Sequence, residues 1–391
     1  MRYNFDKVID RSGTSAEKVE GLKHIWGRTD LIPLWVADMD FATAPFVTDA
    51  IRKRCENEVL GYTGKPDSYY NAIINWVKQR YDLVVAKEMI NFVPGIVPGI
   101  GMAMNCFTQK GDKVMIQPPV YHPFAWVTTR NERTLVTNPL KWENGMYRMD
   151  LDAFREQIKG CKLFILCNPH NPGGVVWTEA ELRAIADICY DEKVLVFSDE
   201  IHADLTLPPH THRPFATVCE KARMNSVTFM SPSKAFNMPG LSASHALIFN
   251  EDLRKRFRIY MDAGELDMGH VFAFLSVEAA YSHGTEWLDQ CLAYIQGNID
   301  FVDEFLKKHA PKIKAIRPEA SYLVWLDCRE LELSQKDLNE FFVDKAHLAL
   351  NDGEMFGKEG IGFMRLNVAS PRCIIEKAMK QLADAYQLYI K

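Results

Sequence analysis

Short apolar runs alternate with longer helical patterns through the middle of the chain. The runs have the length and residue types of buried strands. They are KVMIQ (113–117), KLFILC (162–167), KVLVFS (193–198), NSVTFM (225–230) and SHALIF (244–249). Between the second and third runs, Thr178 followed by Glu181 has the pattern of a capping box, and apolar residues then recur at helical spacing. The order strand, helix, strand predicts an α/β protein with a mostly parallel central sheet covered by helices.

The pattern changes after residue 285. Residues 286–310 have the pattern of a long amphipathic helix, and SYLVWLD (321–327) and FMRLNV (363–368) are typical of two further strands. We therefore expect a smaller α+β domain at the carboxyl end. The predicted division is an N-terminal segment that packs with the small domain (1–45), a large domain (46–284) and a small C-terminal domain (285–391).

The composition is that of an ordinary globular protein, with 47% hydrophobic and 25% charged residues. The formal net charge of -5 and the scattered Lys and Arg give no electrostatic footprint for nucleic acid. The nine cysteines include no CxxC pair, which favours reduced, mostly buried thiols over a zinc ribbon or a disulfide framework. The N-terminus has no apolar leader, and no stretch approaches the ~20 apolar residues of a membrane span. We expect a cytoplasmic protein that does not insert into membranes.

Polar residues directly follow three of the predicted strands. Asn168 follows KLFILC, Asp199 follows KVLVFS, and the tetrapeptide SPSK (231–234) follows NSVTFM. In an open α/β sheet, ligands bind outside the carboxyl ends of the strands. The three strands therefore bring an amide, a carboxylate and a lysine flanked by hydroxyls to one edge of the sheet.

This set of groups suits the chemistry of pyridoxal 5′-phosphate (PLP). A lysine at the end of an apolar strand is partly desolvated, which lowers its pKa and lets its amine form a Schiff base with an aldehyde. Asp199 could keep a pyridinium nitrogen protonated, Asn168 could reach the ring hydroxyl, and the serines of SPSK could bind the phosphate.

A second candidate for the phosphate is the segment PGIVPGIG (94–101), between the apolar run NFV and the helical stretch MAMNCFT. Free backbone N–H groups at a helix N-terminus bind phosphate, and the helix dipole assists. The segment matches neither GxGxxG nor a P-loop. Each piece also has an ordinary structural explanation: a solvated lysine, a helix-capping aspartate, a plain turn at 168–174, or packing glycines. The order and spacing of the whole set favour the cofactor site.

Three motifs resemble those of fold-type I PLP enzymes of the aspartate aminotransferase superfamily: CNPHNPGG (167–174), SDEIHADL (198–205) and SPSKAFNMPGL (231–241). The resemblance runs over essentially the whole chain and implies the PLP-dependent transferase fold, with the cofactor on the large domain. PLWVADMDF (33–41) and FMRLNVASP (363–371) sharpen it to the MalY/PatB-type cystathionine β-lyases, also called C–S lyases.

The resemblance implies roles for individual residues. Lys234 matches the Schiff-base lysine, Asp199 the partner of the ring nitrogen, and Asn168 the amide on the ring 3-hydroxyl. Tyr121 matches the aromatic residue that stacks on the ring, with a core tyrosine as the alternative. Arg365 matches the arginine that clamps the substrate α-carboxylate, with a structural salt bridge as the alternative.

The remaining implied residues surround the phosphate. They are the backbone amides of Ile96 and Val97, the hydroxyls of Ser231 and Ser233, and Tyr62 reaching across from a neighbouring subunit. The resemblance therefore implies a homodimer with active sites at its interface.

Two positions depart from the aminotransferase pattern and fit the β-lyase branch. His202 stands where those enzymes carry a tyrosine, three residues after the aspartate, and we expect it beside the cofactor. Ser242 stands where many carry a phosphate-binding arginine, eight residues after the lysine, which leaves the phosphate to its other ligands. A metal cluster of His202, Asp204, His210 and His212 is disfavoured, because these residues lack a known ligand spacing.

The expected reaction is β-elimination from L-cystathionine or a related cysteine S-conjugate. Lys234 anchors the cofactor and also removes the α-proton, a thiolate leaves the β-carbon, and pyruvate and ammonia follow. Two alternatives stay open. One is an aminotransferase on the same scaffold, in which Lys234 returns the proton to the cofactor. The other is a PLP-fold protein that serves as a regulatory or binding partner.

Overall fold

A seven-stranded sheet forms the centre of the molecule in the computed structural model, which describes residues 2–389. Its strand order is β2-β10-β9-β8-β7-β3-β4. The strands are β2 (Ile90–Val93), β3 (Lys113–Ile116), β4 (Thr134–Thr137), β7 (Cys161–Cys167), β8 (Leu195–Asp199), β9 (Ser226–Met230) and β10 (Ser244–Leu247). Neighbouring strands from β9 to β4 are parallel, whereas β10 is antiparallel to both β9 and β2. The predicted mostly parallel sheet is confirmed, with one strand reversed.

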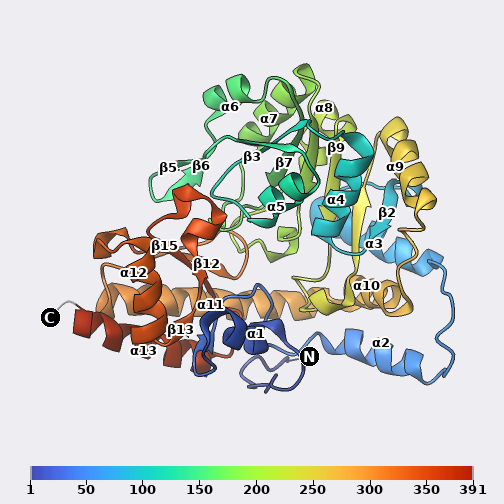
Figure 1. The fold of residues 1–391 in the computed structure, drawn as a ribbon. Helices are drawn as coiled ribbons and strands as arrows, with labels where there is room; N and C mark the ends of the chain where they lie inside the picture. Colours follow the sequence, from blue (N-terminus) through green and yellow to red (C-terminus); the bar gives the residue numbers. More distant parts are fainter. Residues whose placement is uncertain (1, 390–391) are drawn as a thin grey trace.

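Helices cover both faces of this sheet (Figure 1). They are α3 (Asp67–Tyr81), α4 (Ile96–Phe107), α5 (Pro123–Arg130), α6 (Leu151–Gln157), α7 (Glu179–Asp191), α8 (Glu220–Met224), α9 (Glu251–Ala263) and α10 (Val271–His283), while α2 (Pro45–Cys55) packs against α10. Side chains alternate along β8, so Phe197 packs with α4, α5 and α9, whereas Val196 packs with α6, α7 and α8. The predicted capping box begins α7, where the hydroxyl of Thr178 accepts from the backbone N–H of Glu181 at 3.2 Å.

A second, antiparallel sheet has the order β11-β12-β15-β14. Its strands are β11 (Lys314–Ile316), β12 (Leu323–Asp327), β14 (Asn351–Asp352) and β15 (Phe363–Asn367). The long helix α11 (Thr285–His309), orange in Figure 1, runs along the lower side of the molecule, and α13 (Arg372–Tyr389) lies near it. The smaller α+β unit is thus present, while the predicted domain boundaries stay predictions.

The N-terminal segment contacts this second unit through a short parallel pair, β1 (Ile32–Pro33) with β13 (Leu348–Ala349). The remaining helices and strands are α1 (Glu17–Trp26), α12 (Gln335–Glu340), β5 (Lys141–Glu143) and β6 (Met146–Arg148). No helix within residues 2–389 is long and apolar enough to cross a membrane. All nine cysteines are free thiols, and Cys161, Cys167, Cys189, Cys291 and Cys328 are buried, which confirms the prediction of mostly buried thiols.

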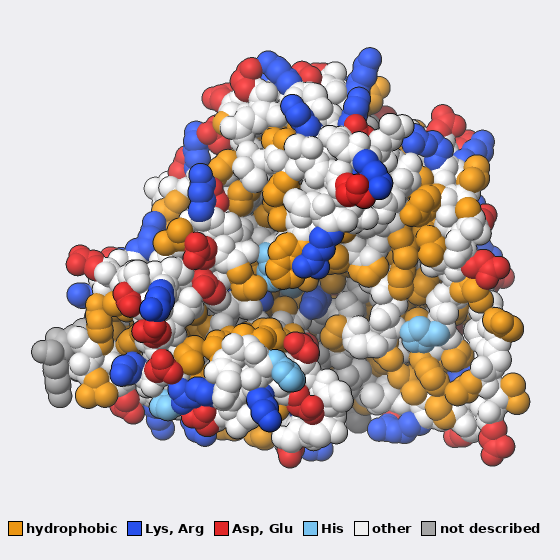
Figure 2. All heavy atoms as spheres, viewed as in Figure 1, with side chains coloured by type: hydrophobic (Ala, Val, Ile, Leu, Met, Phe, Trp, Pro, Cys, Tyr) orange, Lys and Arg blue, Asp and Glu red, His pale blue; other side chains and the backbone are white. Residues whose placement is uncertain are grey.

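The segment between α2 and α3 carries large hydrophobic side chains into solvent. Val59 and Leu60 are exposed, and Tyr62 has 98% of its surface exposed. In Figure 2, hydrophobic side chains gather on the right-hand side of the face, where this segment lies in Figure 1. We call residues 56–66 the arm.

Candidate active site

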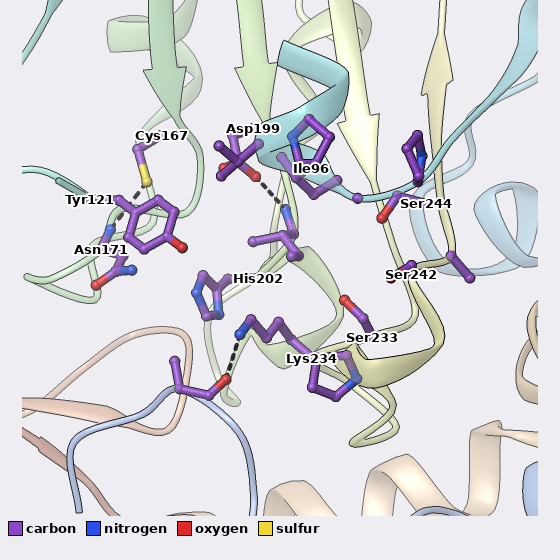
Figure 3. A pocket seen from close by; sticks show the side chains of 18 residues that line it. Ile96, Tyr121, Cys167, Asn171, Asp199, His202, Ser233, Lys234, Ser242 and Ser244 are labelled. Atoms are coloured by element: carbon purple, nitrogen blue, oxygen red, sulfur yellow. Dashed lines mark hydrogen bonds between the residues drawn. The ribbon is translucent and has the colours of Figure 1, made fainter. Parts of the chain in front are cut away.

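A cavity of about 220 Å³ lies at the carboxyl ends of β7, β8 and β9 (Figure 3). Several residues singled out in the sequence line it. They are Ile96, Val97, Tyr121, Asp199, His202, Ser233, Lys234 and Ser242. Neighbouring parallel strands end at the same edge of a sheet, which is why β8 and the loop after β9 deliver a carboxylate and a lysine to one cavity.

Lys234 reaches the cavity from the loop that follows β9. Its Nζ donates a hydrogen bond to the backbone carbonyl of Ala37 (Figure 3). Burial lowers the pKa of Lys234 to about 8, and the charge of Arg365 adds to this, whereas Asp38 and Asp199 act in the opposite direction. A substantial fraction of this amine is therefore neutral near physiological pH.

Asp199 is the last residue of β8 and is buried. Its Oδ1 accepts from the backbone N–H of Ile201 at 3.1 Å. Burial raises the pKa of Asp199 to about 7, and the charge of Lys234 lowers it slightly. A buried carboxyl held this high needs a cationic partner to be fully charged, and a protonated ring nitrogen would be such a partner.

The rest of the cavity wall is neutral. The hydroxyl of Tyr121 points into the cavity, and burial raises its pKa (Figure 3). Burial lowers the pKa of His202 to about 3, and the charges of Lys234 and Arg365 lower it further. The Nδ1 of His202 has no hydrogen-bond partner among residues 2–389. His202 is therefore a neutral imidazole with a free ring nitrogen.

One end of the cavity presents backbone N–H groups and hydroxyls. The sequence predicted a helix only after residue 101, but α4 begins at Ile96, after Gly95 with φ of +145°. The N–H groups of Ile96 and Val97 lie in its first turn, where helical backbone has no internal partner. A Cβ at Gly99 would lie 2.9 Å from Val93 Cγ2, so glycine allows α4 to approach the sheet closely. Ser233, Ser242 and Ser244 lie along the same end (Figure 3).

Asn168 and Ser231, which the sequence predicted at the cofactor, do not line the cavity. Asn168 donates from Nδ2 to the carbonyl of Arg213 at 3.2 Å, and its Oδ1 has no partner among residues 2–389. Ser231 donates to the carbonyl of Ala243 at 2.8 Å and accepts from the N–H of Ser233 at 3.1 Å. Ser231 therefore supports the turn that presents Ser233.

Asn171, which the sequence reasoning missed, lines the cavity where Asn168 was expected. Its Oδ1 accepts from Nη1 of Arg365 at 3.1 Å, and its backbone N–H donates to Sγ of Cys167 at 3.4 Å. The motif CNPHNPGG contains both asparagines, and adjacency to the strand pointed to Asn168 rather than to the one that lines the cavity. Between the two asparagines, Nε2 of His170 lies 2.9 Å from the carbonyl oxygen of Pro119, a hydrogen bond that ties this turn to the loop before Tyr121.

Arg365, on β15, is buried and stands beside Asn171. Besides Asn171, it donates to the carbonyl of Trp35 at 3.1 Å and to Oδ1 of Asn351. These partners are neutral oxygens, and Nε has no partner among residues 2–389. Burial lowers the pKa of Arg365 to about 10, so the guanidinium is charged at neutral pH. A buried cation without a carboxylate partner is a receptor for an anion.

The remaining predicted residues lie apart from the cavity. Tyr62 is exposed on the arm of its own chain. His212 pairs with Glu200 at 2.8 Å, and Asp204 accepts from Trp76 at 3.0 Å and from the hydroxyl of Tyr81. Among residues 2–389, no group of three His, Cys, Asp or Glu side chains is arranged to hold a metal ion.

Comparison with known proteins extends the resemblance. The pattern of the family described as aminotransferase class I and II matches residues 29–382. Cystathionine beta-lyase PatB of Bacillus subtilis is 38% identical over 98% of this chain and 99% of PatB. The structure of cystalysin from Treponema denticola, which contains a pyridoxal 5′-phosphate cofactor, matches with a TM-score of 0.96 at 33% identity over 100% of both chains. The PLP-bound C–S lyase from Staphylococcus hominis matches with a TM-score of 0.91 at 35% identity, over 99% of this chain and 98% of its own. The full-length resemblance predicted from five short motifs is confirmed.

Proposed function

This chain belongs to the class I and II aminotransferase family, and on that premise we propose that it is a PLP-dependent carbon–sulfur β-lyase. It converts a cysteine thioether and water into a thiol, pyruvate and ammonia. One observation carries the proposal: Lys234, with a pKa of about 8, shares a cavity with Asp199, and the guanidinium of Arg365, which has no carboxylate partner among residues 2–389, donates to Asn171 in the cavity wall. The similarity to proteins named cystathionine beta-lyase and C–S lyase supports this type of reaction.

The cavity fits PLP group by group. The N–H groups of Ile96 and Val97, with the hydroxyls of Ser233 and Ser244, suit the phosphate, because a helix N-terminus and hydroxyls both stabilise anions. Asp199 suits the protonated ring nitrogen, because a carboxyl with so raised a pKa needs a cationic partner to be fully charged.

The other ring positions have partners too. Tyr121 can lie against the ring, Asn171 can bind the ring hydroxyl, and Lys234 is the only lysine that lines this cavity within residues 2–389. The free Nδ1 of His202 is available to a ring substituent. Asn168 and Ser231 act one step away, through the loop backbones that they bind.

When bound, the cofactor supplies a ring that accepts electrons from the substrate α-carbon. The protein supplies the base and the orientation. Lys234 takes the α-proton onto Nζ, which its lowered pKa permits at neutral pH. Arg365 binds the substrate carboxylate through a planar fork that fixes the direction of the α-carbon. His202 is neutral, so it adds no charge that would compete with the ammonium formed on Lys234.

The proposal includes a homodimer in which Tyr62 of each subunit approaches the phosphate of the other. The support is the arm: Val59, Leu60 and Tyr62 expose hydrophobic surface side by side, and such patches mark interaction surfaces. Within its own chain Tyr62 is far too exposed to serve as a buried phosphate ligand.

The test is turnover of L-cystathionine as the sole substrate by purified protein reconstituted with PLP, with pyruvate and thiol measured separately. We expect both products in equal amounts, and loss of at least about 1,000-fold in rate for Lys234→Ala. Turnover that requires a keto acid and yields no pyruvate from cystathionine would instead assign an aminotransferase. If neither cystathionine nor any other cysteine thioether reacts, and a protein partner stays stably bound, the chain would instead be a regulatory or binding protein.

A further inference from the structure

The segment Trp35–Phe41, here called the strap, crosses the active site without forming a strand or helix. Its carbonyls are bound by side chains from distant parts of the chain. The donors are Arg365 to Trp35, Asn367 to Val36, Asn367 and Lys18 to Asp38, Lys234 and Tyr322 to Ala37, and Asn237 to Met39 and Phe41. Irregular backbone that is buried must satisfy its polar groups in this way, so the strap has a fixed path.

The donors alternate along the strap. Val36 and Asp38 both accept from the amide of Asn367, at 2.7 Å each. Trp35 and Ala37 accept from the two cations of the active site. The strap is therefore tied both to β15 of the small sheet, through Arg365 and Asn367, and to the predicted Schiff-base lysine, Lys234.

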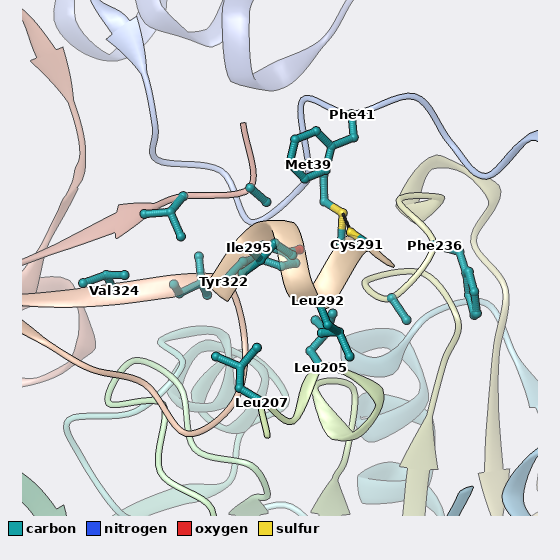
Figure 4. Close-up of a cluster of buried hydrophobic side chains, with 14 of the residues drawn as sticks. Met39, Phe41, Leu205, Leu207, Phe236, Cys291, Leu292, Ile295, Tyr322 and Val324 are labelled. Carbon is teal, nitrogen blue, oxygen red and sulfur yellow. Dashed lines mark hydrogen bonds between the residues drawn. The ribbon is translucent and has the colours of Figure 1, made fainter. Parts of the chain in front are cut away.

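Ala37 differs from the other strap residues because its carbonyl accepts from Lys234, the predicted Schiff-base lysine, and from a second donor as well. The hydroxyl of Tyr322 donates to it at 2.9 Å, and Nζ of Lys234 also donates to it. Burial raises the pKa of Tyr322 well above its usual value, so this phenol keeps its proton and remains a donor. The ring is fully buried in the hydrophobic cluster that includes Met39 and Ile295 (Figure 4). Tyr322 thus holds the carbonyl of Ala37 from a rigid base.

We propose that the carbonyl of Ala37, held in place by Tyr322, is the hydrogen-bond acceptor that positions the Lys234 amine whenever that amine is not joined to the cofactor. Tyr322 is then a positioning residue for the base of the reaction. The inference rests on the proposed function in that Lys234 must be released before it can take the α-proton.

The carbonyl of Ala37 can bind both the neutral and the protonated form of the amine. A carbonyl only accepts, so a neutral amine keeps its lone pair free for the α-proton while one N–H stays on Ala37. When the proton moves from the substrate carbon to Nζ, the resulting ammonium keeps the same contact. The hydroxyl of Tyr322 occupies the other lone pair of the carbonyl, which limits how strongly the ammonium is held. The other charged groups that act on Lys234 are Asp38, Asp199 and Arg365.

The experiment compares Tyr322→Phe with Tyr69→Phe. Tyr69 is an equally buried tyrosine whose hydroxyl has no partner among residues 2–389, so it controls for loss of a buried hydroxyl. The first readout uses the full chain after removal of PLP. The rate at which an acylating reagent modifies Lys234 is measured against pH by peptide mass spectrometry. Without the phenol, the carbonyl holds the ammonium more strongly, so modification at pH 7 should slow about threefold and its midpoint should move upward.

The second readout uses the holoenzyme. For Tyr322→Phe we expect kcat and the exchange of the substrate α-hydrogen with solvent deuterium to fall about tenfold, with KM within about twofold, because a base is misplaced while the carboxylate site is intact. Tyr69→Phe should match the wild type in both readouts. Equal behaviour of the two variants would overturn the proposal.

The readouts separate the inference from the proposed function. A wild-type enzyme that releases no pyruvate would refute the lyase assignment, yet the modification profile of the PLP-free chain would still decide the role of Tyr322. If Tyr322→Phe does not fold, 3-fluorotyrosine at position 322 replaces it, because it keeps the shape and makes the hydroxyl a stronger donor. The midpoint should then move downward, and an unchanged midpoint would refute the proposal.

Discussion

The two ends of the active-site cavity are built in opposite ways. The phosphate end consists of stretches that are short in sequence, 95–97 and 233–244, and offers backbone N–H groups and hydroxyls. Lys234, the only Lys or Arg that lines the cavity within residues 2–389, belongs to the opposite end. Behind the cavity wall at that end, the buried Arg365 and Tyr322 join Lys234 on the strap, so four separate parts of the chain meet there.

This difference between the two ends indicates which contacts contribute most to the binding of cofactor and substrate. At the phosphate end, backbone dipoles and hydroxyls bind one anion through many weak contacts, so the loss of any one contact has a modest effect on affinity. A buried guanidinium with a free N–H has already lost its water, so the partner that reaches it gains a strong charge-assisted contact. Substitutions should therefore have larger effects at the amine and carboxylate end than at the phosphate end.

After Lys234→Ala, the largest effect should come from Arg365→Ala, which removes the receptor for the substrate carboxylate. We expect kcat/KM for the thioether to fall by about 2–4 kcal/mol, or roughly 30- to 1,000-fold, measured from initial rates of pyruvate formation. The matched control is Arg133→Ala, because Arg133 is also buried and also binds neutral partners, Thr108 and Asn105. This control should lower the unfolding temperature and leave kcat/KM within about twofold. Similar losses in both variants would show that Arg365 is a structural arginine.

An intermediate effect should appear in the pH dependence of cofactor capture. Only the neutral amine attacks an aldehyde, and the pKa of Lys234 is about 8. The rate at which the PLP-free chain captures added PLP should therefore rise about tenfold from pH 7 to pH 9. Stopped-flow absorbance measures it. Asp38→Asn should move the midpoint downward, because the charge of Asp38 raises the pKa of Lys234. A rate that falls with rising pH would contradict this account.

The smallest effect should follow from Tyr62→Phe at the phosphate end. Loss of one hydroxyl contact from the neighbouring subunit should raise the dissociation constant of PLP about fivefold, measured by equilibrium dialysis. Tyr190→Phe is the control, because Tyr190 is also an exposed tyrosine and its ring lies near Lys221. Equal retention of PLP by both variants would place the arm away from the phosphate. An effect larger than that of Arg365→Ala would reverse the ranking of the two ends.

Sequence reasoning succeeded where local order determines position. Asp199 and Lys234 follow apolar strands, and parallel pairing of β8 with β9 brings such ends together without further information. The helix N-terminus at Ile96 was expected for the same reason, although its start was placed too late.

Sequence reasoning failed where contacts between distant segments decide orientation. Asn168 and Asn171 belong to one turn, and only Asn171 lines the cavity, where its side chain accepts from Arg365, 194 residues away in the sequence. Tyr322 and Ala37 meet through a hydrogen bond that spans 285 residues of sequence, and no spacing rule signals it. The strap motif was noticed only as a family marker, because its function lies in backbone carbonyls that leave no trace in side-chain identity.

The strap also limits the distance between Lys234 and Arg365. Arg365 comes from the small sheet and Lys234 from the large one, yet both are held by carbonyls that lie two residues apart on one piece of backbone. Two residues of chain reach at most about 7 Å. The spacing between the groups that handle the α-carbon and the carboxylate is thus limited by covalent geometry and not only by how the two sheets pack. Every α-amino acid presents this same end, so the spacing fits the part that all thioether substrates share and does not select the departing thiol.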